Sequence, residues 1–237
     1  MKAGLYLVGT PIGNLQDITL RALEWLKGAS LVVAEDTRQT RKLLDRYEIH
    51  VPLASCHRFN EASRVDFILG KIREGGAVVL VTDSGMPAIS DPGSRVVAAC
   101  HAAGLPVTCA PGPSAVTTAL ALSGFGGAAF SFAGFLPRKP GPRRRLLAAL
   151  CAREEPVVFF ESPFRLLRSL EELRELIGPR PIFLGRELTK QFEEGLTGSA
   201  AELTAAFAGR AVRGELVLVI SPADGRRPVP PEPGECG

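Results

Sequence analysis

Cysteine, histidine and aromatic residues are scarce in this chain, and each scarcity excludes a class of protein. The five cysteines never have the C-x-x-C spacing and are odd in number, which argues against a zinc knuckle and a disulfide framework. Aromatic residues make up 6% of the chain, too few for extensive base stacking on single-stranded nucleic acid. The cysteine spacing also leads us to predict no metal site.

Long hydrophobic runs are also missing. No apolar run approaches the roughly 18 residues that cross a bilayer. Pro11 and Gly13 come too early for the chain to begin with a signal peptide. We expect a soluble, cytoplasmic protein with no membrane partner.

Three common motifs of nucleotide binding and catalysis are absent. The segment Gly9–Gly13 is not G-x-G-x-x-G, and Gly70-Lys71 lacks the upstream glycine of a P-loop. The segment Gly112–Val116 lacks the last glycine of a nucleophile elbow. All three histidines precede Ser114, which is the wrong order for a hydrolase built on that serine.

Positive charge is carried mostly by arginine, with 22 arginines against six lysines and a net charge of +3. Arginine favours contacts with phosphate groups and RNA. A GC-rich genome produces the same bias, so both explanations stay open.

Strand-like and helix-like segments alternate in the first half. Strands are predicted at residues 3–8, 31–34, 52–55, 77–82 and 106–109. Helices are predicted at residues 16–26, 37–47, 59–73, 92–103 and 113–122, with Asp36 or Thr37, Asn60 and Asp91 as N-caps. This alternation predicts βαβ units and a mostly parallel sheet.

The second half has a different pattern. Strands are predicted at residues 128–135, 157–160, 181–186, 193–197 and 215–220, and helices at 143–151, 163–177 and 200–208. The third and fourth strands are close enough to form an antiparallel hairpin, so this sheet is mixed. We predict two α/β domains, 1–117 and 118–222, followed by a disordered tail, 223–237.

Three glycine- and proline-rich loops follow predicted strands, at residues 9–14, 82–93 and 110–115. In an open α/β sheet, ligands bind at the edge where the strands end and the helices begin. The loops predict a small-molecule site lined largely by backbone.

Six blocks of sequence resemble one family. They are G-T-P-I-G-N-L from Gly9, E-D-T-R from Glu35, T-D-S-G-M-P from Thr82 with Asp91-Pro92-Gly93, P-G-P-S-A from Pro111, E-S-P-F-R from Glu161, and R-E-L-T-K from Arg186 with Glu193. Together, in this order over residues 4–221, they resemble the tetrapyrrole-methylase superfamily, and within it the bacterial 16S ribosomal RNA cytidine 2′-O-methyltransferases.

The resemblance implies an activity and its partners. It implies S-adenosylmethionine (SAM) bound in a cleft between the two domains, and methyl transfer to the ribose 2′-hydroxyl of a decoding-centre cytidine. It also implies a homodimer that acts on the small ribosomal subunit. The residues it places at the cofactor are Pro11, Asp83, Ser84, Gly85, Pro87, Ser114, Ala115, Glu161 and Ser162.

These cofactor residues also have purely structural interpretations. Asp83, Ser114 and Ser162 fit the capping of a turn or a helix, and Pro11 fits a turn. Gly85 is predicted to have a positive φ.

A ribose hydroxyl is a poor nucleophile, so a base or a cation that stabilises the developing alkoxide is expected. Candidates follow the second strand and lie in the C-terminal hairpin: Glu35, Asp36, Arg38, Arg186, Glu187, Lys190 and Glu193. Of the hairpin residues, Lys190 is favoured. Acidic neighbours of Lys190 favour its protonated form, and therefore contact with a phosphate or alkoxide rather than a base role. The sequence does not identify the base, and a solvated charged hairpin around Lys190 remains the alternative.

A basic cluster is predicted to contact RNA. It comprises Arg138, Lys139, Arg143, Arg144 and Arg145 on a loop stiffened by prolines, joined by Arg186 from the hairpin. A solvated loop is the alternative.

Three other functions compete with RNA methylation. A methylase of the same fold could act on a tetrapyrrole, a non-catalytic module could bind the ribosome without SAM, and a hydrolase could use Ser114. The basic cluster favours RNA over the tetrapyrrole.

Overall fold

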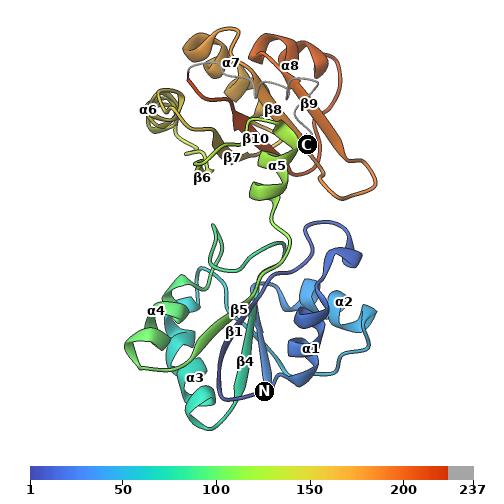
Figure 1. The fold of residues 1–237 in the computed structure, drawn as a ribbon, viewed down its shortest axis with the longest axis vertical. Helices are drawn as coiled ribbons and strands as arrows, with labels where there is room; N and C mark the ends of the chain where they lie inside the picture. The colour runs from blue at the N-terminus through green and yellow to red at the C-terminus, as the bar shows by residue number, and fades with distance from the viewer. Residues whose placement is uncertain (224–237) are drawn as a thin grey trace, which may run out of the picture. The chain divides into compact units, whose positions relative to one another are not determined.

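The computed structural model describes residues 1–223, and these fold as two compact units that divide between Ser114 and Ala115. The boundary predicted at residue 117 falls inside helix α5, which begins the second unit (Figure 1). Apart from Ala223, the predicted tail lies outside the described residues. Within residues 1–223, no helix is long and apolar enough to cross a membrane, and no group of acidic, histidine and cysteine side chains could hold a metal ion.

The first unit is a parallel sheet with the strand order β3-β2-β4-β1-β5. Its strands are β1 (Gly4–Val8), β2 (Leu31–Ala34), β3 (Leu53–Ser55), β4 (Ala77–Val81) and β5 (Val107–Ala110). Its helices are α1 (Leu20–Gly28), α2 (Thr37–Arg46), α3 (Glu61–Arg73) and α4 (Ser94–Ala102), with a short 3₁₀ turn η1 (Leu15–Asp17). The predicted parallel sheet is confirmed.

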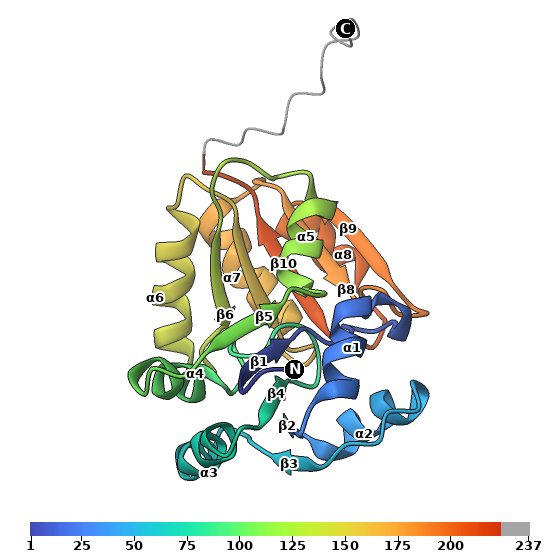
Figure 2. The same cartoon turned by 60° about the horizontal axis from the view of Figure 1, so that its bottom comes forward.

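Helices cover both faces of this sheet, α1 and α2 on one face and α3 and α4 on the other (Figures 1 and 2). This explains why β2 and β4 are apolar and buried along their whole length. The carboxyl ends of β1, β4 and β5 lie at one edge of this parallel sheet, and the three glycine- and proline-rich loops begin there.

Two predicted helix starts are wrong. The helix expected at 16–26 is split, because Asn14 caps η1 and Thr19 then caps a new helix by accepting from the Ala22 N–H. Helix α4 begins at Ser94, with Gly93 rather than Asp91 as its N-cap residue. Buried Glu61, from α3, accepts hydrogen bonds from the Gly93 and Arg95 N–H groups at 2.9 and 3.0 Å and takes over the capping role.

The second unit is the predicted mixed sheet, with the strand order β6-β7-β10-β8-β9. Its strands are β6 (Ser131–Phe135), β7 (Val157–Glu161), β8 (Ile182–Arg186), β9 (Glu194–Gly198) and β10 (Leu216–Ile220). Its helices are α5 (Ala115–Ser123), α6 (Pro140–Cys151), α7 (Leu166–Ile177) and α8 (Ala200–Ala206). Strands β6 and β7 are parallel, and β8 and β9 form the predicted antiparallel hairpin. Helices α6, α7 and α8 share one apolar core with the sheet.

Candidate active site

The loops after β1 and β4 are joined by backbone hydrogen bonds at the carboxyl edge of the first sheet. Thr10 and Gly85 form an isolated antiparallel bridge, with N···O distances of 2.9 and 3.1 Å. The Thr10 hydroxyl also donates to the Thr82 carbonyl at 3.0 Å. Gly85 has a φ of 83°, which confirms its predicted positive φ.

The loops after β1 and β5 approach each other without side chains between them. A Cβ atom at Gly9 would lie 2.8 Å from the Cα of Gly112, closer than atoms can pack. Glycine at both positions is therefore required by the close approach of the two backbones. Backbone atoms of the two loops therefore meet directly at this edge of the sheet.

The predicted cofactor residues of the first unit differ in accessibility. Gly85 and Pro87 are buried, so they shape the turn from inside. The others retain exposed surface, and these are Pro11, Asp83, Ser84 and Ser114, together with Ala115 at the start of the second unit.

Acidic side chains gather at this edge. The Thr82 hydroxyl donates to Glu35 Oε2 at 2.9 Å, and Asp83 Oδ1 accepts from the Asp36 N–H at 3.0 Å. Burial raises the pKa of Asp83, and burial with nearby Glu35 and Asp83 raises the pKa of Asp91 to about 6. An edge with this charge suits a cationic ligand.

Asp36 and Arg38, two of the predicted catalytic residues, bind each other. Asp36 caps α2 by accepting from the Arg38 N–H at 2.8 Å, and its carboxylate also accepts from the Arg38 guanidinium at 2.6 Å. The guanidinium holds the pKa of Asp36 at about 2, so this carboxylate is a weak base. The Arg38 side chain is 86% exposed, and its cation remains accessible to a substrate.

The raised pKa of Asp91 leads to a pH-dependent stability. The folded state holds this proton up to a higher pH than the unfolded state, so the contribution of Asp91 to stability falls as the pH rises from about 4 to about 6. Asp91→Asn removes the charge, and at pH 7.5 we expect stabilisation by about 1 kcal/mol after allowance for solvent screening, or about 2–4 °C in Tm. Thermal melts from pH 4 to 7.5 should show this advantage disappearing at the acid end. A constant difference across that range would contradict the assignment.

Glu161, predicted at the cofactor, is an internal residue of the second unit. Its side chain is 0% exposed and makes an ion pair with Arg165 at 2.6 Å. The same oxygen, Oε1, accepts from the Ser162 N–H at 2.7 Å, and Oε2 accepts from the Ser169 hydroxyl at 2.5 Å. Because both oxygens are occupied inside the unit, Glu161 fixes the junction of β7 and α7, whereas Ser162 keeps part of its surface exposed.

Lys190 lies in the turn, residues 187–193, that joins β8 to β9. Its ammonium group contacts Glu187 Oε1 at 2.8 Å and Glu215 Oε2 at 3.0 Å. Partial burial alone would lower the pKa of Lys190, but these two carboxylates outweigh it and the pKa is raised. The acidic surroundings predicted for Lys190 are confirmed, and they exclude it as a base near neutral pH.

Other features hold this turn rigid. Glu187 and Thr189 have positive φ values of 50° and 66°, unusual for residues with a side chain. The Thr189 N–H donates to the Glu193 carboxylate, and Glu187 Oε1 accepts from the Glu215 N–H at 2.8 Å. The Lys190 ammonium is therefore held in one place.

The predicted basic cluster lies only partly on a loop, because Arg138 and Lys139 precede α6 but the other three arginines do not. Helix α6 begins at Pro140, so Arg143, Arg144 and Arg145 are helical. Arg143, predicted to contact RNA, is instead 1% exposed and forms an ion pair with Glu172 of α7 at 2.5 Å. Its helical position turns it inward.

The other predicted RNA contacts reach the surface to different degrees. Arg138, Lys139, Arg144 and Arg145 are exposed. Arg186 is partly buried and pairs with Glu194 at 2.8 Å.

Comparisons with known proteins agree on one family. Residues 4–204 match the model of the Tetrapyrrole (Corrin/Porphyrin) Methylases. A protein of Thermotoga maritima named Ribosomal RNA small subunit methyltransferase I is 48% identical, over 92% of this chain and 97% of its own length. A Bacillus subtilis protein with the same name is 43% identical, over 91% of this chain and 74% of its own length.

Solved structures share the fold. The methyltransferase CobJ aligns with a TM-score of 0.70 and 22% identity, covering 93% of this chain and 95% of its own. Uroporphyrin-III C-methyl transferase from Thermus thermophilus, solved with S-adenyl homocysteine, aligns with a TM-score of 0.65 and 18% identity, covering 91% and 96%. The family model over residues 4–204 and the relatives at 48% and 43% identity show that the chain belongs to the tetrapyrrole methylase family.

Proposed function

We propose that this chain transfers a methyl group from SAM to the ribose 2′-hydroxyl of a cytidine in the decoding centre of 16S ribosomal RNA, on the small ribosomal subunit in the cytoplasm. The observation that carries the proposal is the 48% identity, over nearly the whole chain, to a relative named for ribosomal RNA small subunit methylation. The Bacillus subtilis relative carries the same name.

The acidic edge of the first unit fits SAM. SAM carries a positively charged sulfonium and an ammonium group, which Glu35, Asp83 and Asp91 complement in charge. The loops are fixed before any ligand arrives. A backbone bridge joins Thr10 to Gly85, and Gly9 lies against Gly112. When bound, SAM supplies a methyl group on a ready leaving group, so the protein needs mainly to position the two reactants.

The other candidate residues act on the acceptor. The fixed, protonated Lys190 is suited to stabilise the alkoxide that develops on the ribose oxygen, or to contact the adjacent phosphate. The exposed guanidinium of Arg38 supplies a second cation to the RNA backbone. Asp36 holds this guanidinium in place, and Glu35 is part of the acidic edge that complements SAM.

The test is transfer of labelled methyl from SAM to small subunits prepared without the modification, followed by nuclease digestion and mass spectrometry. We expect labelled 2′-O-methylcytidine. SAM binding without transfer to subunits would instead favour the second candidate, a tetrapyrrole acceptor, which the structural likeness to the uroporphyrin-III enzyme supports. The same assay with uroporphyrinogen measures that alternative directly. Subunit binding without SAM binding would indicate a non-catalytic module.

The proposal includes a homodimer. Strand β6 and the residue before it expose two aromatic side chains, Phe130 at 43% and Phe135 at 61%. Phe135 also packs against half-buried Phe160, with ring centroids 5.3 Å apart. A second copy would cover such a surface. Sedimentation velocity tests this, and a monomer at micromolar concentration would refute it.

A further inference from the structure

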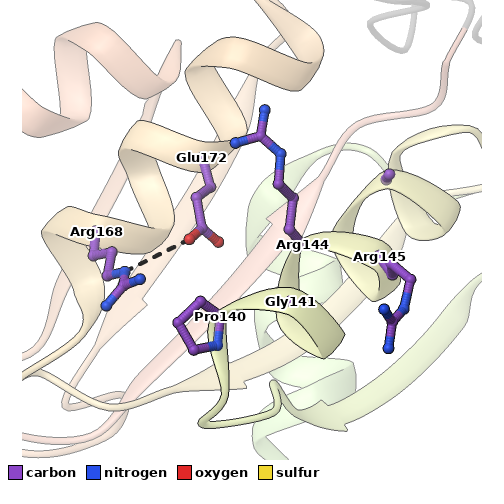
Figure 3. A pocket seen from close by; sticks show the side chains of 7 residues that line it. Pro140, Gly141, Arg144, Arg145, Arg168 and Glu172 are labelled. Atoms are coloured by element: carbon purple, nitrogen blue, oxygen red, sulfur yellow. Dashed lines mark ion pairs between the residues drawn. The ribbon is translucent and has the colours of Figure 1, made fainter.

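An open pocket of about 630 Å³ lies between the starts of α6 and α7 (Figure 3). Pro140, Gly141, Arg144 and Arg145 line it from α6, and Arg168 and Glu172 line it from α7. Arg168 was not among the residues that the sequence pointed to. It is brought beside the basic segment only by the packing of the two helices.

A buried ion pair forms the base of this arrangement. Arg143 Nε and Nη2 contact the two oxygens of Glu172 at 2.9 and 2.5 Å, a bidentate pair. Arg168 Nε lies 3.6 Å from Glu172 Oε1, within ion-pair range but beyond a hydrogen bond. Because Arg143 already neutralises Glu172, Arg168 keeps its donors for another partner.

The pocket is left positively charged. Arg144 pairs with Glu175 at 2.8 Å and remains 59% exposed. Within residues 1–223, no carboxylate lies within 4.0 Å of the Arg145 guanidinium. The start of α6 adds the positive end of its dipole, and no side chain caps it.

The shape and charge together select the ligand. Planar guanidinium groups on two helices match the oxygens of a phosphate group better than a flat or apolar ligand. Gly141, which has no side chain, leaves the mouth open, and a Cβ atom there would meet nothing within 4 Å. A purely solvated surface would not need a bidentate pair buried beneath its arginines.

We propose that this pocket binds a backbone phosphodiester of the RNA substrate, with Arg145 and Arg168 as the direct contacts and the Arg143–Glu172 pair holding α6 and α7 in place. The inference rests on the proposed function and deepens it. It narrows the predicted basic cluster to a defined subsite, adds Arg168 and removes Arg143 from the RNA contacts.

The test is Gly141→Asp, which places a negative charge at the mouth of the pocket. The variant should fold, because the site has room and an acidic residue in the first turn of a helix is favourable. The matched control is Gly127→Asp, which adds the same charge at an exposed glycine with equally open surroundings outside the pocket. A second variant, Arg145→Ala with Arg168→Ala, removes the proposed contacts.

Affinity for small subunits is measured against KCl concentration, with Tm and SAM affinity measured in parallel. We expect both pocket variants to lose about tenfold or more in affinity at low salt. The double alanine variant should also lower the salt slope by about 1, because both arginines contact the same phosphodiester. Tm and SAM affinity should not change, and the control should match wild type.

The outcomes distinguish failure of the proposed pocket from failure of the proposed methyl transfer. Wild-type affinity and salt slope in the pocket variants, with methyl transfer intact, would overturn the pocket and leave the proposed function standing. Failure of the wild type to bind subunits at all would overturn both. Free phosphate is the other source of the same chemistry. A rise in wild-type Tm with inorganic phosphate, lost in the pocket variants while subunit affinity is unchanged, would assign the pocket to a free anion and refute the RNA contact.

Discussion

Arg143→Ala is expected to destabilise the second unit by about 3–5 kcal/mol, whereas Arg145→Ala, two residues away, should change its stability by less than about 0.5 kcal/mol. The difference follows from burial. Arg143 is 1% exposed and neutralises Glu172, itself only 14% exposed, so its removal leaves a carboxylate largely buried without its bidentate partner. Arg145 is exposed and its loss strands no charge. Urea or thermal unfolding of the two variants measures the contrast.

The control for this prediction is a double variant that removes both members of the Arg143–Glu172 ion pair. Arg143→Met combined with Glu172→Leu replaces both charges by apolar side chains of similar volume, which is often neutral or stabilising for buried ion pairs. The double variant should therefore recover most of the stability that Arg143→Ala loses. Equal stability of Arg143→Ala and Arg145→Ala would mean that the ion pair contributes little.

The inward position of Arg143 could have been predicted from its spacing. Once a helix is taken to begin at Pro140, where proline favours the first position, Arg143, Leu147 and Leu150 fall on one face. All three are buried. The helix predicted at 143–151 begins three residues after the start of α6 but already contains this face, so grouping Arg143 with the basic loop overlooks a signal that the sequence carries. The partner, Glu172, is 29 residues away, and no local pattern identifies it.

The first sheet was predictable for a simple reason. A parallel strand covered on both faces is apolar throughout, so Leu31–Ala34 is found in the structure with the bounds that the sequence gives. A helix start was harder to predict from the sequence where a side chain from a distant part of the chain caps the helix. Glu61 caps α4 from another helix, and the local sequence suggested Asp91 instead.

The same contrast between local sequence signals and tertiary contacts holds for the candidate site. Strand ends and glycines identified the loops, because a turn after a buried strand has a local signature. Glu161 is held by Arg165, which belongs to the same sequence block, and by Ser169, which lies outside it. The complete burial of Glu161 depends on tertiary packing and could not be predicted from the block. Sequence patterns therefore located the loops, and packing decided which of their side chains face outward.

Lys190→Ala is expected to lower the rate of methyl transfer by about 10²–10³-fold while SAM affinity changes little. The structure holds the Lys190 ammonium between Glu187 and Glu215 and keeps it protonated. A fixed cation with spare donors stabilises an alkoxide or phosphate as the reaction proceeds, and this stabilisation is absent when only SAM is bound. Single-turnover rates on unmodified small subunits and calorimetry with SAM measure the two quantities separately.

The competing explanation is that Lys190 only braces a strained turn. Glu187 and Thr189 have left-handed backbone conformations there, and without the ammonium the carboxylates of Glu187 and Glu215 would lose the cation between them. A bracing role predicts a lower Tm and losses in SAM affinity and rate together. Lys190→Arg separates the two, because a guanidinium can satisfy both carboxylates but cannot reproduce the position of a single ammonium against the acceptor oxygen. Full rescue of Tm with a rate that stays at least about tenfold low would support contact with the substrate, and equal rescue of both would assign Lys190 to the turn.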